Sequence, residues 1–141
     1  MFKILIIDPN HPFRRSLKKV LANRFPFVDI REASNGSEGS DLVQSFMPDL
    51  IFLEIHLTSE RGLDLSRRIK IDHPEIVIVL LTSYDLPEYQ AAAEESGAEH
   101  LVPKDDWTGE DMIALVDRII SDRNVAGQKL EDRHQPQEHS S

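Results

Sequence analysis

The amino-acid sequence predicts an α/β fold: a doubly wound, five-stranded parallel sheet with helices on both faces. Short apolar runs alternate with segments of helical spacing five times along the 141-residue chain. That alternation is typical of parallel strands joined by right-handed helical crossovers. The strongest apolar runs are also continuous rather than alternating, which indicates strands buried on both faces beneath helices.

The first half of the chain supplies two short strands and two helices before the central strand. Residues 3–7 form an apolar strand that closes at Asp8. Apolar residues at helical spacing then predict a helix over residues 13–23, and a second strand is expected over residues 28–33. Turn residues precede a short helix that we expect over residues 37–46.

The third expected strand, residues 48–55, is the segment around which the other elements are placed. Pro48 suits the first position of a strand, and a continuous apolar run leads from it into Glu54. Burying a carboxylate is costly unless it is paired. We therefore expect Glu54 to face a crevice at the C-terminal edge of the sheet, where ligands of open α/β sheets bind. The alternative, that Glu54 is simply the first solvated residue, is disfavoured because the apolar pattern continues to Ile55.

The second half of the chain completes the alternation. His73-Pro74 ends the third helix near Asp72, and the β-branched run at residues 76–81 predicts the fourth strand. A short alanine-rich helix follows over residues 87–96. Residues 100–102 form a short fifth strand that leads into Pro103 and Lys104.

The last helix begins at a capping box and gives way to a polar segment. Thr108, followed three residues later by Asp111, is a helix-start pattern. From Asn124 the chain is polar and aperiodic, which predicts a disordered tail or linker. The expected organisation is one folded domain over residues 1–123 and a tail over residues 124–141.

Composition excludes several classes of function. The net charge is −9, whereas nucleic-acid and anionic membrane surfaces require basic footprints. The chain has no cysteine, which rules out disulfides and thiolate chemistry. Apolar runs are far shorter than a membrane helix requires, and the N-terminus leads directly into a strand. We expect a soluble, cytoplasmic protein that binds neither nucleic acid nor membranes.

Four polar residues follow or end four of the expected strands: Asp8, Glu54, Thr82 and Lys104. Parallel strands bring these ends to one edge of the sheet. Two carboxylates, one hydroxyl and one cation would then converge where phosphate or metal chemistry is possible. Each residue alone is a weak signal, but the ordered set is far more specific.

The chain resembles the receiver domain of two-component response regulators over about residues 3–122. The matching stretches are residues 4–8, 48–55, 62–64, 80–83 and 97–105. The resemblance implies a flavodoxin-like sheet in the order 2-1-3-4-5. It also implies that two acids after the first strand hold Mg²⁺ together with an acceptor aspartate, which takes a phosphoryl group from a histidine kinase. A threonine or serine and a lysine would contact the phosphoryl oxygens.

Three positions depart from the pattern of that family. The second acid is Pro9, the acceptor position is Glu54, and the usual aromatic residue of the fifth strand is Leu101. Asp8 at the metal position, and Thr82 and Lys104 at the phosphoryl contacts, match the pattern.

The departures predict an altered site. Mg²⁺ requires near-octahedral oxygen coordination, so a site of Asp8, Glu54 and the His56 carbonyl would be weak, and no other cofactor is expected. Glu54 is one methylene longer than aspartate, about 1.5 Å, which moves its carboxylate toward Lys104 and Thr82. Because in-line phosphoryl transfer depends on positioning, we expect no normal aspartyl phosphorylation. Glu54 is either a partial mimic of the phosphorylated residue, salt-bridged to Lys104, or a structural ion pair.

The leading interpretation is a stand-alone, atypical receiver that acts as a non-enzymatic protein-interaction module. Its partner would be a histidine kinase or a downstream signalling protein. The resemblance also implies possible homodimerisation through the face of residues 87–96, 100–102 and the last helix. The alternatives are a receiver fragment of a larger regulator, a small phosphatase with Asp8 as nucleophile, a flavin or nucleotide carrier, or a transition-metal site at His11 and His56.

Overall fold

The computed structural model describes residues 1–84 and 86–134, with side chains described through Asn124 except at Asp85. Five parallel strands form one sheet in the order β2-β1-β3-β4-β5, as predicted. The strands are β1 (Lys3–Ile7), β2 (Asp29–Ala33), β3 (Leu50–Glu54), β4 (Val77–Thr82) and β5 (His100–Pro103). The helices are α1 (His11–Arg24), α2 (Gly36–Phe46), α3 (Gly62–Asp72), α4 (Pro87–Glu95) and α5 (Gly109–His134).

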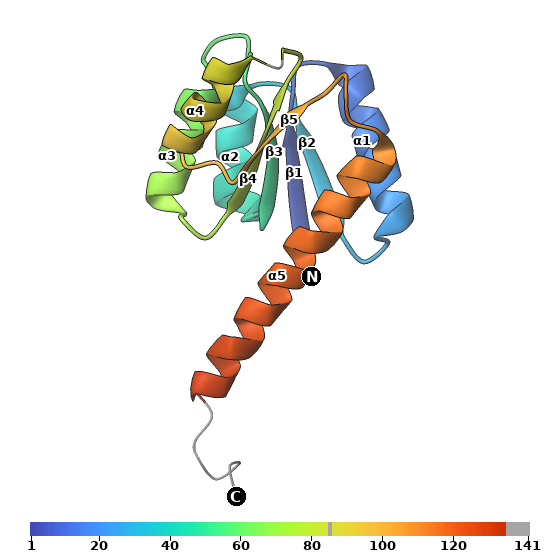
Figure 1. Cartoon of the computed structure of the whole chain (residues 1–141), viewed down its shortest axis with the longest axis vertical. Helices are drawn as coiled ribbons and strands as arrows, with labels where there is room; N and C mark the ends of the chain where they lie inside the picture. The colour runs from blue at the N-terminus through green and yellow to red at the C-terminus, as the bar shows by residue number, and fades with distance from the viewer. Residues whose placement is uncertain (85, 135–141) are drawn as a thin grey trace, which may run out of the picture.

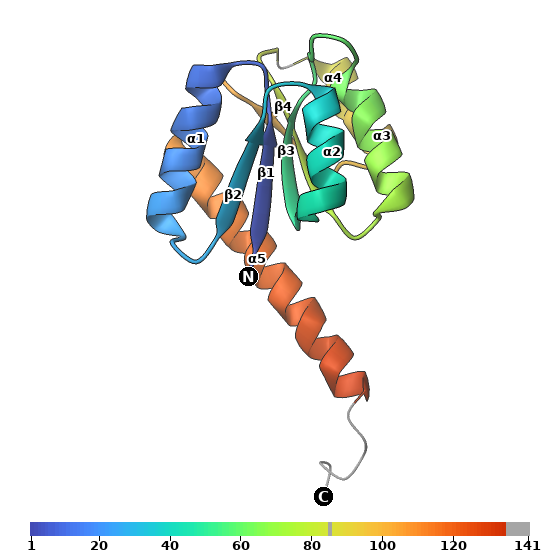
Figure 2. The ribbon, with the colours of Figure 1, turned by 180° about the vertical axis from the view of Figure 1, so that it is seen from behind.

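Helices cover both faces of the sheet. Helices α1 and α5 lie on one face, and α2, α3 and α4 lie on the other (Figures 1 and 2). Alternate residues of each strand therefore enter two separate cores. In β1, for example, Ile4 and Ile6 pack with α1 and α5, whereas Leu5 and Ile7 pack with α2 and α3. This explains why the strand sequences are apolar at successive positions.

The register brings four strand ends to one edge. Ile7 is paired with Leu53, so Asp8 follows β1 beside Glu54 at the end of β3. Thr82 is paired with Pro103, so Lys104 follows β5 beside the end of β4. The backbone N–H of Lys104 donates to the Thr82 carbonyl oxygen at 2.7 Å, which holds the Lys104 backbone at this edge.

Helix α5 begins at the predicted capping box. The Thr108 hydroxyl accepts from the Asp111 N–H at 3.2 Å, and the Thr108 N–H donates to the Asp111 carboxylate at 2.8 Å. The helix then continues through His134 and extends away from the sheet (Figure 1). No helix within residues 1–84 and 86–134 is long and apolar enough to cross a membrane.

The length of α5 corrects one expectation. Residues 124–134 are helical, where the sequence predicted a disordered tail or linker. Most residues in this window are good helix formers, and extending an existing helix needs no new nucleus. Residues 135–141, the remainder of the predicted tail, lie outside the described residues. The boundary of the receiver domain at residue 123 stays a prediction.

Candidate functional site

Lys104 lies at the centre of the site at the C-terminal edge of the sheet. Its ammonium group donates to Asp8 Oδ2 and to Glu54 Oε1, each at 2.7 Å. All three side chains are at least nine-tenths buried. The bond between Glu54 and Lys104 was predicted from the length of the glutamate. The bond to Asp8 was not, because the sequence placed that residue at a metal position.

The remaining carboxylate oxygens are also hydrogen-bonded. Asp8 Oδ1 accepts from the backbone N–H of Asn10 at 2.8 Å, and Glu54 Oε2 accepts from that of His56 at 2.9 Å. Asn10 is in turn the N-cap of α1, since its side chain accepts from the Phe13 N–H. The start of α1 and the loop after β3 therefore hold both acids in place.

The environment of Lys104 favours its charged form. Burial lowers the pKa of the ammonium group, but its hydrogen bonds to Asp8 and Glu54, and their negative charges, outweigh burial and raise the pKa above its usual value. The Phe13 ring centroid lies 4.3 Å from Nζ, so a cation–π contact adds to this stabilisation.

Arg14 forms a second buried network beside this site, which the sequence analysis missed. The guanidinium donates to the carbonyl oxygen of Asp8 and, at 2.9 Å, to Glu32. It also lies 3.1 Å from His11 Nδ1. Arg14 stands three and seven residues before Leu17 and Leu21, which are buried on the same helix face. An arginine at those spacings is the signal that could have revealed it.

Thr82 occupies the predicted strand end, but its hydroxyl is directed elsewhere. It donates to the Tyr84 carbonyl oxygen at 3.1 Å and accepts from the Tyr84 N–H at 3.0 Å, and the residue is fully buried. This local turn competes for the hydroxyl. No hydrogen bond is found between the Glu54 carboxylate and Thr82 within the described residues, because that carboxylate accepts from Lys104 and from the His56 N–H.

A cavity of about 310 Å³ opens above the buried acids. Exposed Pro9 lies at its rim, and Leu101 lies away from it, half-buried against the core that faces α2, α3 and α4. The cavity is lined by Asp8, Pro9, Asn10, Glu54, His56, Ser83, Tyr84 and Lys104.

The donor set of this cavity fits Mg²⁺ poorly. In each of its two carboxylates, one oxygen accepts a hydrogen bond from Lys104 and the other accepts one from a backbone N–H. Pro9 adds no side-chain oxygen. The structure also disfavours a transition-metal site at His11 and His56. His11 contacts Arg14, whereas the His56 imidazole lies 3.3 Å from the Tyr89 hydroxyl. Among the described residues, no three histidine or acidic side chains are grouped to hold a metal ion.

Comparison with known proteins agrees with the fold. The family model of the response regulator receiver domain matches residues 4–117. A two-component response regulator structure from Clostridium difficile is 30% identical, with a TM-score of 0.82 over 88% of this chain and 99% of that chain.

Two curated relatives are longer proteins. The transcriptional regulatory protein HptR of Staphylococcus aureus is 28% identical over 138 residues, which is 95% of this chain and 54% of that protein. Protein-glutamate methylesterase/protein-glutamine glutaminase 3 of Hahella chejuensis is 34% identical over 103 residues, 72% of this chain and 29% of that protein. This chain spans about half, or less, of the curated relatives that it matches. With its sheet order and its match over residues 4–117, the chain belongs to the response regulator receiver family of two-component signalling.

Proposed function

We propose that this receiver is an atypical, non-enzymatic protein-interaction module that does not run an aspartyl phosphorylation cycle. The observation that carries the proposal is the pair of hydrogen bonds that Lys104 donates to Asp8 and Glu54, at 2.7 Å each. The cation that would meet phosphoryl oxygens is already neutralised by two internal carboxylates. An incoming phosphoryl group would have to compete with both carboxylates for this ammonium group.

The acceptor position supports the same conclusion. Glu54 exposes 6% of its surface, and both of its oxygens accept hydrogen bonds, one from Lys104 and one from the His56 N–H, which lowers their reactivity toward phosphorus. The extra methylene also displaces the carboxylate by about 1.5 Å from where an aspartate would place it. A misplacement of about 1 Å can cost 10²-fold in rate. Thr82 contributes little here, since its hydroxyl is bonded to Tyr84.

Two roles for Glu54 give different outcomes on substitution. As a partial mimic of the phosphorylated residue it would hold the active surface in place, although it brings one negative charge against up to about two for a phosphoryl group. As a structural ion pair it would affect stability alone. If Glu54→Gln alters stability but leaves partner affinity unchanged, the mimic role fails.

The phosphatase alternative is disfavoured by the geometry of Asp8. A nucleophilic carboxylate must reach phosphorus, but Asp8 exposes 1% of its surface, and both of its oxygens accept hydrogen bonds that lower their nucleophilicity. Hydrolysis of a generic aryl phosphate that Asp8→Asn abolishes would restore this alternative.

The partner class follows from the family and remains part of the proposal. We propose a histidine kinase or a downstream signalling protein as partner, with homodimerisation through the face of α4, β5 and α5 as a further mode. Because the chain carries a net charge of −9, we do not expect it to bind nucleic acid. A stand-alone protein and a fragment of a larger regulator both fit these properties.

The proposal is tested by an amide NMR titration with Mg²⁺ and beryllofluoride, a phosphoryl analogue. The wild type is compared with a Pro9→Asp/Glu54→Asp double variant. We expect no shifts at residues 8, 54, 82 and 104 in the wild type and clear shifts in the double variant. Shifts in the wild type would show that the site accepts a phosphoryl analogue and would refute the proposal. Intact-mass analysis after incubation with acetyl phosphate gives an independent readout.

A further inference from the structure

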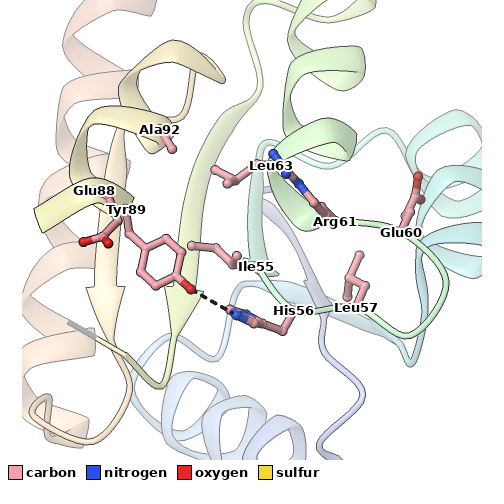
Figure 3. Close-up of a pocket in the computed structure, with 9 residues that line it drawn as sticks. All are labelled: Ile55, His56, Leu57, Glu60, Arg61, Leu63, Glu88, Tyr89 and Ala92. Atoms are coloured by element: carbon pink, nitrogen blue, oxygen red, sulfur yellow. Dashed lines mark hydrogen bonds between the residues drawn. The ribbon is translucent and has the colours of Figure 1, made fainter. Parts of the chain in front are cut away.

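A second cavity, of about 510 Å³, lies between α4 and the loop that joins β3 to α3 (Figure 3). Apolar side chains form most of it: Ile55, Leu57 and Leu63 on one side, and Tyr89 and Ala92 of α4 on the other. Its volume lies within the range of about 300–1,000 Å³ that is typical of ligand pockets. It is open to solvent, so it is a groove rather than an internal void.

Two exposed apolar side chains also precede the N-terminus of α4. Tyr84 and Leu86 expose 58% and 42% of their surface on the segment before the helix. Large apolar side chains gathered on an exposed surface beside a groove are typical of protein-interaction sites. Within the described residues, nothing covers this surface.

Charge around the groove is distributed unevenly. Helix α4 carries Glu88, Glu94 and Glu95, all exposed, and has no lysine or arginine. On the opposite side, basic residues are balanced by nearby acids: Arg68 Nη1 lies 2.9 Å from Glu60 Oε2, and Arg61 Nε lies 3.7 Å from Asp64 Oδ2. Glu88, which lines the groove, forms no ion pair with any described side chain. The uncompensated charge at the α4 wall is therefore negative.

His56 joins this groove to the buried lysine site, since it lines both cavities. Its N–H donates to Glu54 Oε2, and its imidazole meets the Tyr89 hydroxyl at 3.3 Å (Figure 3). One residue thus connects the acceptor position to the wall of the groove. A side chain bound in the groove would contact His56, whose backbone N–H donates to Glu54.

We propose that this groove docks a basic amphipathic segment of a partner protein, with a large apolar side chain between Tyr89 and Leu57 and a lysine or arginine beside Glu88. The inference rests on the proposed function as an interaction module and specifies the chemistry of its partner. Apolar anchors supply affinity, and complementary charge selects the partner.

The test uses two synthetic helical peptides with the same leucine face, one carrying lysines and the other glutamates on the opposite face. Each is titrated into the ¹⁵N-labelled full chain. We expect the lysine peptide to shift amides within residues 55–63 and 88–92, with an affinity at least about tenfold higher than that of the glutamate peptide. Equal affinities, or shifts confined to another face, would overturn the proposal.

Matched variants locate the binding. Ala92→Trp fills the groove and is expected to abolish binding, whereas Ala91→Trp, at the neighbouring exposed position, should leave it unchanged. Glu88→Lys should weaken binding of the lysine peptide about three- to tenfold, whereas Asp41→Lys on α2 should leave its affinity unchanged. Binding that survives Ala92→Trp would refute the assignment. Concentration-dependent line broadening that this variant abolishes would instead assign the groove to a second copy of the chain.

The two proposals fail separately. A wild-type response to beryllofluoride would refute the loss of phosphorylation while leaving peptide binding at the groove intact. If beryllofluoride causes no amide shifts in the wild type and the groove shows no charge-selective binding, the docking site alone would be refuted.

Discussion

Removing the cation between the two buried acids is the sharpest test of the site. Lys104→Met keeps most of the side-chain volume and deletes the ammonium group. Asp8 and Glu54, which expose 1% and 6% of their surface, would each lose a hydrogen bond of 2.7 Å. Two negative charges would then remain buried close together with no cation between them.

The magnitude can be worked out in two ways. A hydrogen bond to a charged group contributes about 1.5–3 kcal/mol, so the two bonds of Lys104 together contribute about 3–6 kcal/mol. Removing one partner of a buried ion pair costs about 3–5 kcal/mol. The ranges overlap, and we expect Lys104→Met to lower the free energy of unfolding by about 3–5 kcal/mol. That is a large share of the roughly 5–15 kcal/mol typical of a domain.

Urea unfolding measures this loss directly. Trp107, the single tryptophan, packs against the core near the start of α5 and reports unfolding by fluorescence. With a slope of about 2 kcal/mol per M, the midpoint should fall by roughly 2 M. Lys19→Met, at an exposed position on α1, should change stability by less than about 0.5 kcal/mol. A loss below about 1 kcal/mol for Lys104→Met would show that the two contacts are not maintained in solution.

Three further predictions concern neighbouring features. The pKa of Lys104 is raised in the folded state, so the charged lysine contributes its full stabilisation of the fold below its unfolded pKa of about 10.4. Urea midpoints of the wild type should therefore fall as pH rises above that value toward the folded pKa. This fall should be steeper than that of Lys104→Met. Gly62→Ala should destabilise by about 1–3 kcal/mol in the same assay, since a Cβ would clash with the Glu54 carbonyl oxygen; a neutral result would mean that the loop after β3 can shift. Thr108→Ala removes the hydroxyl that caps α5 and should cost about 0.5–2 kcal/mol, whereas Thr58→Ala in the loop before α3 is the control with no cap to lose.

Much of this fold could be predicted from the sequence because the buried strands are apolar at successive positions. Such short, β-branched runs favour strands covered on both faces, and their alternation with helices leaves few topologies. The convergence of Asp8, Glu54 and Lys104 followed from the same pattern, since parallel strands place their C-terminal ends along one edge. The end of α5 could not be predicted, because helix extension past Asn124 depends on a helix already nucleated by packing.

The orientations of the polar side chains could not be predicted from strand order. Thr82 lies at its expected position, yet its hydroxyl forms a local turn with Tyr84. Asp8 binds Lys104, although the pattern of residues placed it at a metal site. For Thr82 a local hydrogen bond competes with the ligand that the family pattern implies. For Asp8 the competing bond comes from Lys104, 96 residues further along the chain.

The choice of glutamate explains why these internal bonds would resist an external anion. A carboxylate attached to β3 is held beside Lys104 by the fold, so its effective concentration there far exceeds that of any free phosphoryl donor. Both groups are already desolvated, and displacing Glu54 would leave a buried charge without a partner. On the proposed function, the lysine that meets a transient phosphoryl group in a phosphorylated receiver already binds two internal carboxylates here. Partner binding at this surface would then depend on expression and affinity rather than on a phosphoryl donor.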